Sequence, residues 1–488
     1  MQDLTFGIIG GLGTLAGADL FLKLVKSRAV MADQGRYHFL FEQHPFRDVA
    51  VPLTRDASMT GRKLYVFKTC QSFESRTADA VLMPCFASHT FREELQAELS
   101  VRIVNMMDAL GQALRDALPD GGRIGILASD YVRHARLFEA QFGERYDIVY
   151  PTDATQATLM EAMYGIDGIK AGNTEGLCLE HIHQACQELV DAGAALIVPG
   201  MTELSLVASA LQRRGIAIVD VNQVYADYAT SLADGQVNLV FKLGIVGGVG
   251  PAATVDFMGK VVKNTTASKD QDHIKMVVEQ NPQIPDRTAN LLRHEADPTV
   301  ALYATCKRLE SEGANAIAIP CNTAHAYVER IQPHLSVPIV NMLTETVTHI
   351  VNKYGKCTKV GLLATSGTVE SRVYHDAAAG QLELVAPEPA YQEMVMDAIY
   401  GPEGVKAGYT QGHCADQLRA AISHLQGRDA RVQILGCTEL PLIFAQTDNF
   451  RVAEETVALV DPTDVLAKRC VQLARPGVAD NDRLHQRV

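Results

Sequence analysis

Two cysteines stand where their residue type and neighbours suit proton-transfer chemistry. Each ends a short apolar segment and opens a stretch with helical periodicity, Cys321 in Pro-Cys-Asn-Thr-Ala-His and Cys437 in Gly-Cys-Thr-Glu. A cysteine at such a place is often only a small buried hydrophobe. However, a helix N-terminus also lowers a thiol pKa and enriches the thiolate. The matching positions of the two cysteines, 116 residues apart, favour a shared function.

A pair of thiols suits the inversion of an amino acid at its Cα atom. One group must remove a proton from one face of that carbon, and another must deliver a proton to the opposite face. Thiols can do both, because their unperturbed pKa near about 8.5 can be shifted toward neutrality. We therefore predict that Cys321 and Cys437 act as an acid/base pair and exchange roles at each turnover.

The motifs around these cysteines occur twice in the chain, which indicates a tandem duplication. The offset between the copies is 236 residues at the cysteine, lysine and threonine motifs and 237 at the first glycine. The paired segments begin at Gly7 and Gly244, Pro84 and Pro320, Val104 and Val340, Ile124 and Val360, Tyr164 and Tyr400, Lys170 and Lys406, and Thr202 and Thr438. We predict one domain over residues 1–236, with the joint near Asp234-Gly235-Gln236, a second over residues 240–475, and a polar tail over 476–488.

Short apolar runs alternate with helical stretches, which predicts βαβ units and mainly parallel sheets. In the second half the predicted strands are Lys242–Val246, Lys275–Val278, Ala316–Ile319, Val337–Val340, Val360–Ala364 and Val432–Leu435. We predict an α/β fold in which each repeat has two doubly wound, Rossmann-like lobes, with the helix after Asp461 returning to the first lobe. Ligands bind beyond the carboxyl ends of such strands, where both cysteines stand.

A glycine-rich turn follows the first strand of each half. Gly248-Val-Gly-Pro-Ala-Ala253 fits the G-x-G-x-x-A pattern of dinucleotide-binding proteins, and Glu279 closes the next strand. The acidic residue comes about 30 residues later, whereas the fingerprint places it at roughly 20. A helix N-terminus that holds a substrate carboxylate is the better interpretation of this turn.

Together with Ile284-Pro-Asp-Arg-Thr288, these motifs resemble the aspartate/glutamate racemase superfamily, in particular its cofactor-independent aspartate racemases and broader-specificity amino-acid racemases. The resemblance spans about Leu243–Leu473, and the first half resembles the same fold with eroded motifs. It implies a PLP-independent isomerase that racemises an amino acid, with aspartate or glutamate favoured, using no cofactor and no metal.

The resemblance also implies roles for individual residues. Cys321 and Cys437 would be the acid/base groups, and the substrate would be bound by Asn322, Thr323, Thr438, Arg287, Asp286 and Lys406. An arginine offers a fork for bidentate carboxylate binding, and a positive charge near Cα stabilises the developing carbanion.

Several of these residues keep an alternative explanation. Arg287 could pair with Asp286 in a turn, and Lys406 could be a solvated surface charge. His325 could polarise the Cys321 thiol or be a core histidine. Glu439 could cap its helix or tune Cys437, and Thr365 could bind a carboxylate or cap a helix.

The first half departs from this pattern at the chemically important positions. It keeps Cys85, His89, Lys170, Thr202 and Glu203, but Met201 stands where the second half has Cys437. Methionine has no ionisable proton, so two-base chemistry is impossible there. The carboxylate-binding positions are replaced as well, by Phe86, Ala87, Val49 and Ala50. We predict that the first half is a structural or regulatory pseudo-domain. A small gap in the register between the two halves would bring Arg47-Asp48 near the site, so binding of a modified ligand there stays an alternative.

Composition bounds the remaining choices. The chain of 488 residues exceeds the roughly 250–300 that one core supports. A net charge of −13 without a basic cluster argues against a nucleic-acid partner. No signal peptide or membrane-spanning run is evident, so we predict a cytoplasmic protein with a small-molecule amino-acid ligand and no membrane partner. We expect the two repeats to form an intramolecular pseudo-dimer, and a homo-oligomer remains open.

Three alternative functions also remain. These are a one-cysteine decarboxylase or isomerase, a non-catalytic binding protein for amino acids or dicarboxylates, and an NAD enzyme.

Overall fold

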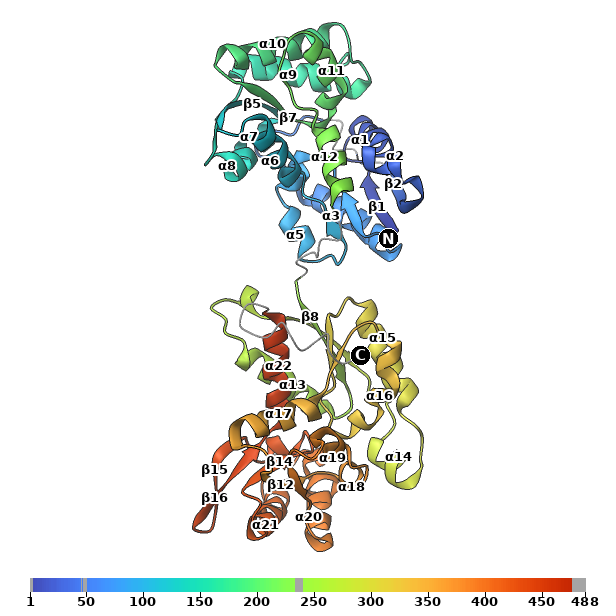
Figure 1. Cartoon of the computed structure of the whole chain (residues 1–488), viewed down its shortest axis with the longest axis vertical. Coiled ribbons are helices and arrows are strands. Elements are labelled where there is room, and N and C mark those ends of the chain that lie inside the picture. The colour runs from blue at the N-terminus through green and yellow to red at the C-terminus, as the bar shows by residue number, and fades with distance from the viewer. Residues whose placement is uncertain (1–2, 45, 47–50, 233–239, 476–488) are drawn as a thin grey trace. The chain divides into compact units, whose positions relative to one another are not determined.

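The computed structural model describes residues 3–44, 46, 51–232 and 240–475, and the chain divides into two compact units, Met1–Leu239 and Val240–Val488 (Figure 1). Each unit has two lobes, and each lobe is a sheet flanked by helices. All described strand pairs are parallel except one. The predicted α/β fold with two doubly wound lobes in each repeat is therefore confirmed.

The first lobe of the second unit is a sheet of strand order β11-β10-β8-β9. Its strands are β8 (Lys242–Gly247), β9 (Lys275–Gln280), β10 (Ala316–Ala318) and β11 (Ile339–Val340). The last helix, α22 (Pro462–Ala474), packs on this lobe, because Leu466 and Cys470 lie in one core with Ile245 and Phe257. The predicted return of the final helix to the first lobe is confirmed.

The second lobe of this unit has the strand order β13-β12-β14-β16-β15. Its strands are β12 (Lys359–Leu363), β13 (Glu383–Val385), β14 (Val432–Leu435), β15 (Thr447–Val452) and β16 (Glu455–Val460). The sequence analysis did not predict the antiparallel hairpin of β15 and β16. Its turn, Ala453-Glu454, contains none of the Gly, Asn or Asp residues that usually mark a hairpin, although Ala453 has a φ of 51°.

The other helices of the second unit connect these strands. They are α13 (Pro251–Asn264), α14 (Arg287–Arg293), α15 (Thr299–Ser311), α16 (Val328–Ile331), α17 (Met342–Tyr354), α18 (Ser366–Glu370), α19 (Val373–Ala378), α20 (Pro389–Tyr400) and α21 (His413–Gly427). Helix α13 begins at Pro251, whose missing N–H costs nothing in a first helical turn.

The first unit repeats this plan with the sheets β2-β1-β3-β4 and β6-β5-β7. Its strands are β1 (Leu4–Ile9), β2 (Tyr37–Glu42), β3 (Ala80–Leu82), β4 (Arg102–Ile103), β5 (Gly122–Ala128), β6 (Tyr146–Val149) and β7 (Leu196–Gly200). Its helices are α1 (Thr14–Lys26), α2 (Arg28–Ala32), α3 (Thr60–Ser75), α4 (Phe86–His89), α5 (Arg92–Gln96), α6 (Met106–Ala117), α7 (Asp130–His134), α8 (Leu137–Phe142), α9 (Asp153–Tyr164), α10 (Leu177–Asp191), α11 (Ser205–Arg213) and α12 (Val221–Ser231).

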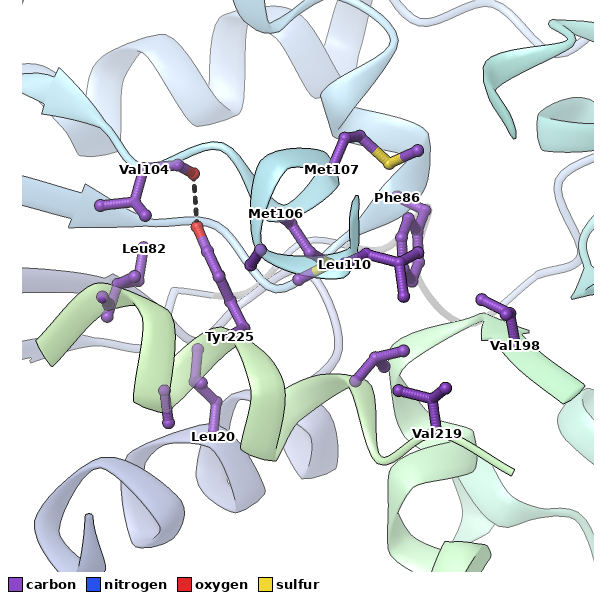
Figure 2. Close-up of a cluster of buried hydrophobic side chains, with 14 of the residues drawn as sticks. Leu20, Leu82, Phe86, Val104, Met106, Met107, Leu110, Val198, Val219 and Tyr225 are labelled. Carbon is purple, nitrogen blue, oxygen red and sulfur yellow. Dashed lines mark hydrogen bonds between the residues drawn. The ribbon is translucent and has the colours of Figure 1, made fainter. Parts of the chain in front are cut away.

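Helix α12 is the last helix of the first unit, as α22 is the last helix of the second. Figure 2 shows Tyr225 of α12 among Leu20, Leu82 and Met106, with its hydroxyl donating a 2.7 Å hydrogen bond to the Val104 carbonyl. A buried tyrosine needs such a partner for its hydroxyl. The final helix of each unit therefore joins the lobe that carries the first cysteine of that repeat.

Among the described residues, no helix is both long enough and apolar enough to cross a membrane. The predicted joint near residues 234–236 and the tail from Pro476 lie outside the described residues.

Candidate active site

One pocket of about 300 Å³ lies where β10 and β14 end in the second unit. Cys321 follows β10 and Cys437 follows β14, so the two lobes each bring one thiol to this pocket. Both cysteines are buried, at 7% exposure each. The lining residues are Val249, Arg287, Thr288, Cys321, Asn322, Thr323, Thr365, Tyr400, Lys406, Gly436, Cys437, Thr438 and Glu439. The structure thus brings together every candidate residue named from the sequence except Asp286 and His325.

Cys437 lies in a chain of polar contacts that ends at a lysine. Its Sγ donates a 3.1 Å hydrogen bond to Oε2 of Glu439, whose Oε1 accepts a 2.6 Å bond from Nζ of Lys406. Burial and the Glu439 carboxylate raise the pKa of Cys437 well above its ordinary value, although Lys406 acts in the opposite direction. These surroundings therefore favour the protonated thiol form of Cys437.

Glu439 is itself held in its charged form. Burial would raise the pKa of this carboxyl, but the Lys406 ammonium outweighs that effect and the pKa is lowered. Burial likewise disfavours the charge on Lys406, and Glu439 and Cys437 together raise its pKa. Only the carboxylate end of this ion pair is buried, because 5% of the Glu439 side chain is exposed but 27% of the Lys406 side chain.

The glycine-rich turn makes room for this carboxylate. Gly250 has a φ of +130°, and a Cβ atom there would lie 2.6 Å from Oε1 of Glu439. A side chain at this position would therefore displace Glu439 as well as strain the backbone. A substrate carboxylate at this helix N-terminus stays a prediction; the carboxylate of Glu439 lies beside Gly250.

Arg287 supplies a positive charge next to Cys321. Its Nη1 donates to the Pro285 carbonyl at 3.1 Å and its Nη2 to the Val249 carbonyl at 3.2 Å. Burial disfavours the charge, but the interactions with Cys321 and Asp286 raise the pKa of Arg287. The guanidinium is thus fixed by backbone carbonyls, and it interacts electrostatically with the Cys321 thiol.

Asp286 is exposed and has a mainly structural position. Its Oδ1 accepts a 2.7 Å hydrogen bond from the Ala289 N–H, which makes Asp286 the N-cap of α14. It therefore orients the helix that carries Arg287, and it does not line the pocket.

Two buried hydrogen-bond donors in this pocket have no partner among the described residues. They are Nε of Arg287 and Nδ2 of Asn322. Asn322 is held in place by its other amide atom, because Oδ1 accepts a 2.6 Å bond from the hydroxyl of Tyr374. An unsatisfied buried donor is costly and rare, and a ligand carboxylate would satisfy both.

Threonine hydroxyls connect the two lobes across the pocket. Thr323 lies 2.7 Å from the hydroxyl of Thr368, and Thr288 donates a 3.3 Å bond to Thr365. Thr365 also caps α18 by accepting from the Thr368 N–H. Thr365 is thus both a helix cap and a member of this hydroxyl cluster. Thr438 donates to the Glu439 carboxylate at 3.3 Å.

His325 has the contacts of a core histidine. Its Nδ1 lies 2.9 Å from the Cys321 carbonyl oxygen, and its Nε2 accepts from the Met342 N–H at 3.1 Å. Burial lowers its pKa to about 4, so the ring is neutral and Nδ1 carries the proton. His89 makes the same contacts in the first unit, at 3.0 Å to both the Cys85 carbonyl and the Met106 N–H.

Tyr400 and Thr288 line the pocket and Tyr374 contacts Asn322, although none of the three was given a role in the site from the sequence. The Lys406 ammonium lies 5.3 Å from the centre of the Tyr400 ring, a cation–π distance. Burial raises the pKa of Tyr400 to about 12, so its hydroxyl stays protonated. The repeated Tyr-Gly motif at Tyr164 and Tyr400 could have pointed to this residue.

The first unit has a pocket at the equivalent place. Cys85, Lys170, Met201, Thr202 and Glu203 all line it. Lys170 pairs with Glu203, as Lys406 pairs with Glu439. Arg47, Asp48, Val49 and Ala50, which the sequence comparison placed at or near this site, lie outside the described residues.

In the described part of the chain, no group of three His, Cys, Asp or Glu side chains is arranged to hold a metal ion.

Comparison with known proteins gives a consistent result. The family model described as Asp/Glu/hydantoin racemase matches residues 9–229 and again residues 246–470. A broad-specificity amino-acid racemase of Bacillus subtilis is 28% identical over 233 residues, which cover 47% of this chain and 96% of the relative. A glutamate racemase of Koribacter versatilis is 31% identical and covers 35% of this chain and 57% of its own. Among solved structures, the aspartate racemase of Picrophilus torridus is 30% identical with a TM-score of 0.41, over 48% of this chain and 94% of that one.

Proposed function

Because the chain belongs to the Asp/Glu/hydantoin racemase family, and the tandem match confirms the predicted duplication, we propose that its second unit racemises an amino acid with Cys321 and Cys437 as acid and base. The observation that carries this proposal is the unequal setting of two thiols in one pocket. Cys437 is held as a thiol by Glu439, and Cys321 adjoins the Arg287 cation.

We propose that the substrate α-carboxylate binds the two unpaired donors, Nε of Arg287 and Nδ2 of Asn322. The Cys321 thiolate then removes the Cα proton from one face, and the Cys437 thiol delivers its proton to the other. The positive charge of Arg287 stabilises the carboxylate as negative charge from Cα spreads into it. The product leaves Cys321 protonated and Cys437 as thiolate, which is the form that accepts the opposite enantiomer.

The Glu439–Lys406 pair sets the resting form of this cycle. A Cys437 thiolate would face the Glu439 carboxylate, which favours return of the proton to Cys437. Lys406 partly offsets the effect of Glu439 on the pKa of Cys437, so both the thiol and the thiolate of Cys437 stay accessible.

The substrate class is proposed from the family, and the charge of the pocket suits the α-carboxylate of an amino acid. With Lys406 engaged by Glu439, Arg287 is the cation of the described pocket lining that is available for the α-carboxylate. We favour aspartate or glutamate, and broader specificity is the alternative. Names of relatives include broad-specificity, glutamate and aspartate racemases.

The test is incorporation of deuterium at Cα when the full-length protein is incubated with a panel of amino acids in heavy water. We expect incorporation with inversion for at least one acidic amino acid. Cys321→Ser and Cys437→Ser should each lose activity by about 10²–10⁴-fold, whereas Cys357→Ser, which changes an exposed cysteine, should not. Activity above about a tenth of wild type in either site variant would contradict the two-thiol mechanism.

We further propose that the first unit is a pseudo-domain for racemisation. Met201 takes the place of the second thiol, while the strands and the Lys170–Glu203 pair are kept. Because the first unit is fused to the second, it could take the place of a separate partner subunit, so that pairing of the two folds becomes intramolecular. Sedimentation of the full chain and of each unit would test whether such pairing, or a homo-oligomer, occurs.

A further inference from the structure

The pocket of the first unit holds a buried cation that its repeat partner lacks. The pocket has a volume of about 390 Å³ and lies where β3 and β7 end. Arg62, in the first turn of α3, lines this pocket and is only 4% exposed. The residue 236 positions later is Pro298, so Arg62 has no counterpart at the other site. There the cation is Arg287, which comes from α14 instead.

Arg62 has little to neutralise it. Its Nη1 lies 3.6 Å from Sγ of Cys85, and its guanidinium lies 5.3 Å from the centre of the Phe46 ring. Among the described residues, no carboxylate lies within ion-pair distance of Arg62, and the only acid lining the pocket, Glu203, pairs with Lys170. Asp130, which adjoins the pocket residue Tyr164, accepts from Gln156.

Among the described residues that line this pocket, the charged side chains are those of Arg62, Lys170 and Glu203, which leaves one positive charge in excess within the lining. Taking an arginine out of water is costly unless an anion compensates it. Planar guanidinium groups match carboxylates, to which they can donate two parallel hydrogen bonds. The geometry of the pocket thus favours a small organic anion as ligand.

At three positions this pocket has an apolar side chain where the pocket of the second unit has a polar or ionisable one. Phe86 and Ala87 stand in place of Asn322 and Thr323, and Met201 stands in place of Cys437. The remaining apolar residues of the wall are Leu12, Leu53 and Val132. Such a surface gains free energy by covering the hydrocarbon part of a ligand, at about 25 cal/mol per Å².

We propose that the first unit has a second, separate ligand site, in which Arg62 binds the carboxylate of a monocarboxylate whose apolar substituent lies against Phe86 and Met201. The ligand is bound without inversion, because this pocket has one thiol. Cys85 lies beside the bound carboxylate and reports on its presence. This proposal does not depend on racemisation in the second unit.

The test measures protection of Cys85 from iodoacetamide in the full-length protein, followed by peptide mass, with Cys321 read in the same digest. Hexanoate is the probe, and hexanamide is its neutral analogue of nearly equal size. We expect hexanoate to slow labelling of Cys85 in a saturable way, succinate and acetate to do so at much higher concentration, and hexanamide to have no effect.

Variants of Arg62 test the residue itself. Arg62→Met should weaken protection by about tenfold to a hundredfold, the range of a lost hydrogen bond to a charged group. Arg62→Lys should weaken it less, and the matched control Lys68→Gln, an exposed change on the same helix, should leave it unchanged. Each of three results would overturn the proposal. The first is protection of Cys85 by hexanamide equal to that by hexanoate, and the second is no protection by hexanoate at about 10 mM, a concentration that suffices for ordinary weak binding. The third result is full protection of Cys85 in a folded Arg62→Met protein. If Arg62→Met does not fold, the comparison of hexanoate with hexanamide on the unaltered protein decides it.

Discussion

Replacing Glu439 by Gln should convert Cys437 from an acid into a base. Glu439 and Cys437 are both buried, and their side chains are 3.1 Å apart, so solvent screens their interaction little. Two unit charges at about 4 Å interact by about 4 kcal/mol at an effective dielectric constant of about 20. At 1.36 kcal/mol per pKa unit, removal of the carboxylate charge should lower the Cys437 pKa by up to about three units. Lys406, freed from its partner, acts in the same direction.

The measurement is the rate of alkylation of Cys437 against pH, read by peptide mass. In the unaltered protein the rate should still be rising above about pH 9, because the pKa of Cys437 is raised well above the ordinary value of a thiol. In Glu439→Gln the midpoint should fall by at least about one unit. Racemisation should slow most in the direction that needs the Cys437 thiol as acid.

The matched control is Glu203→Gln, the same change at the equivalent ion pair of the first unit. It should leave the Cys437 profile where it was. A Cys437 midpoint in Glu439→Gln that stays within about half a unit of wild type, or rises, would refute the electrostatic reasoning.

Three further predictions concern the neighbouring groups. Arg287→Lys should lower kcat/KM for acidic substrates by tenfold or more, on the order expected when a bidentate fork becomes a point charge; unchanged kcat/KM would remove Arg287 from carboxylate binding. Burial holds the pKa of both His325 and His89 at about 4, below the ordinary value of 6.5, so their neutral forms stabilise the fold above pH 6.5 and that stability is lost as the pH falls toward 4. Each histidine accounts for up to about 3 kcal/mol of this loss in the free energy of unfolding. In urea unfolding, the free energy of unfolding of His325→Asn should fall less steeply with decreasing pH than that of wild type. An unchanged pH dependence would contradict the assignment of His325 as a buried neutral histidine. Cys85→Ser should leave racemase turnover within about twofold of wild type, since it removes no group from the Cys321–Cys437 site; a large loss in a folded protein would place chemistry in both units.

Residue pattern alone was sufficient for the architecture and for most of the candidate site. The offset of 236 residues established the duplication, because two copies of one fold keep the same spacing between strand ends. Strand β14 was predicted with its observed bounds, Val432–Leu435, since a short apolar run between turns is a local signal. The hairpin of β15 and β16 was missed because its turn carries no such signal.

The tertiary structure decided what each polar group contacts. Asn322 receives a hydrogen bond from Tyr374, 52 residues later, and Lys406 pairs with Glu439 across 33 residues. It also gave the contacts of His325, which is held by two backbone groups, and of Asp286, which caps a helix. The cap at Asp286 has a local sequence signature, since Asp is a preferred N-cap residue, but the pairings of Asn322 and Lys406 have none.

The pocket around Arg62 shows most clearly what the sequence determines and what only the tertiary structure determines. The sequence determined that the first half has one thiol where the second has two, because that depends only on residue identity and register. It contained no indication that an arginine from another helix faces Cys85, since α3 and the end of β3 meet only when the lobe folds. The types and spacing of residues indicate which of them can do chemistry. The contacts between distant segments determine which charges in a pocket remain unpaired.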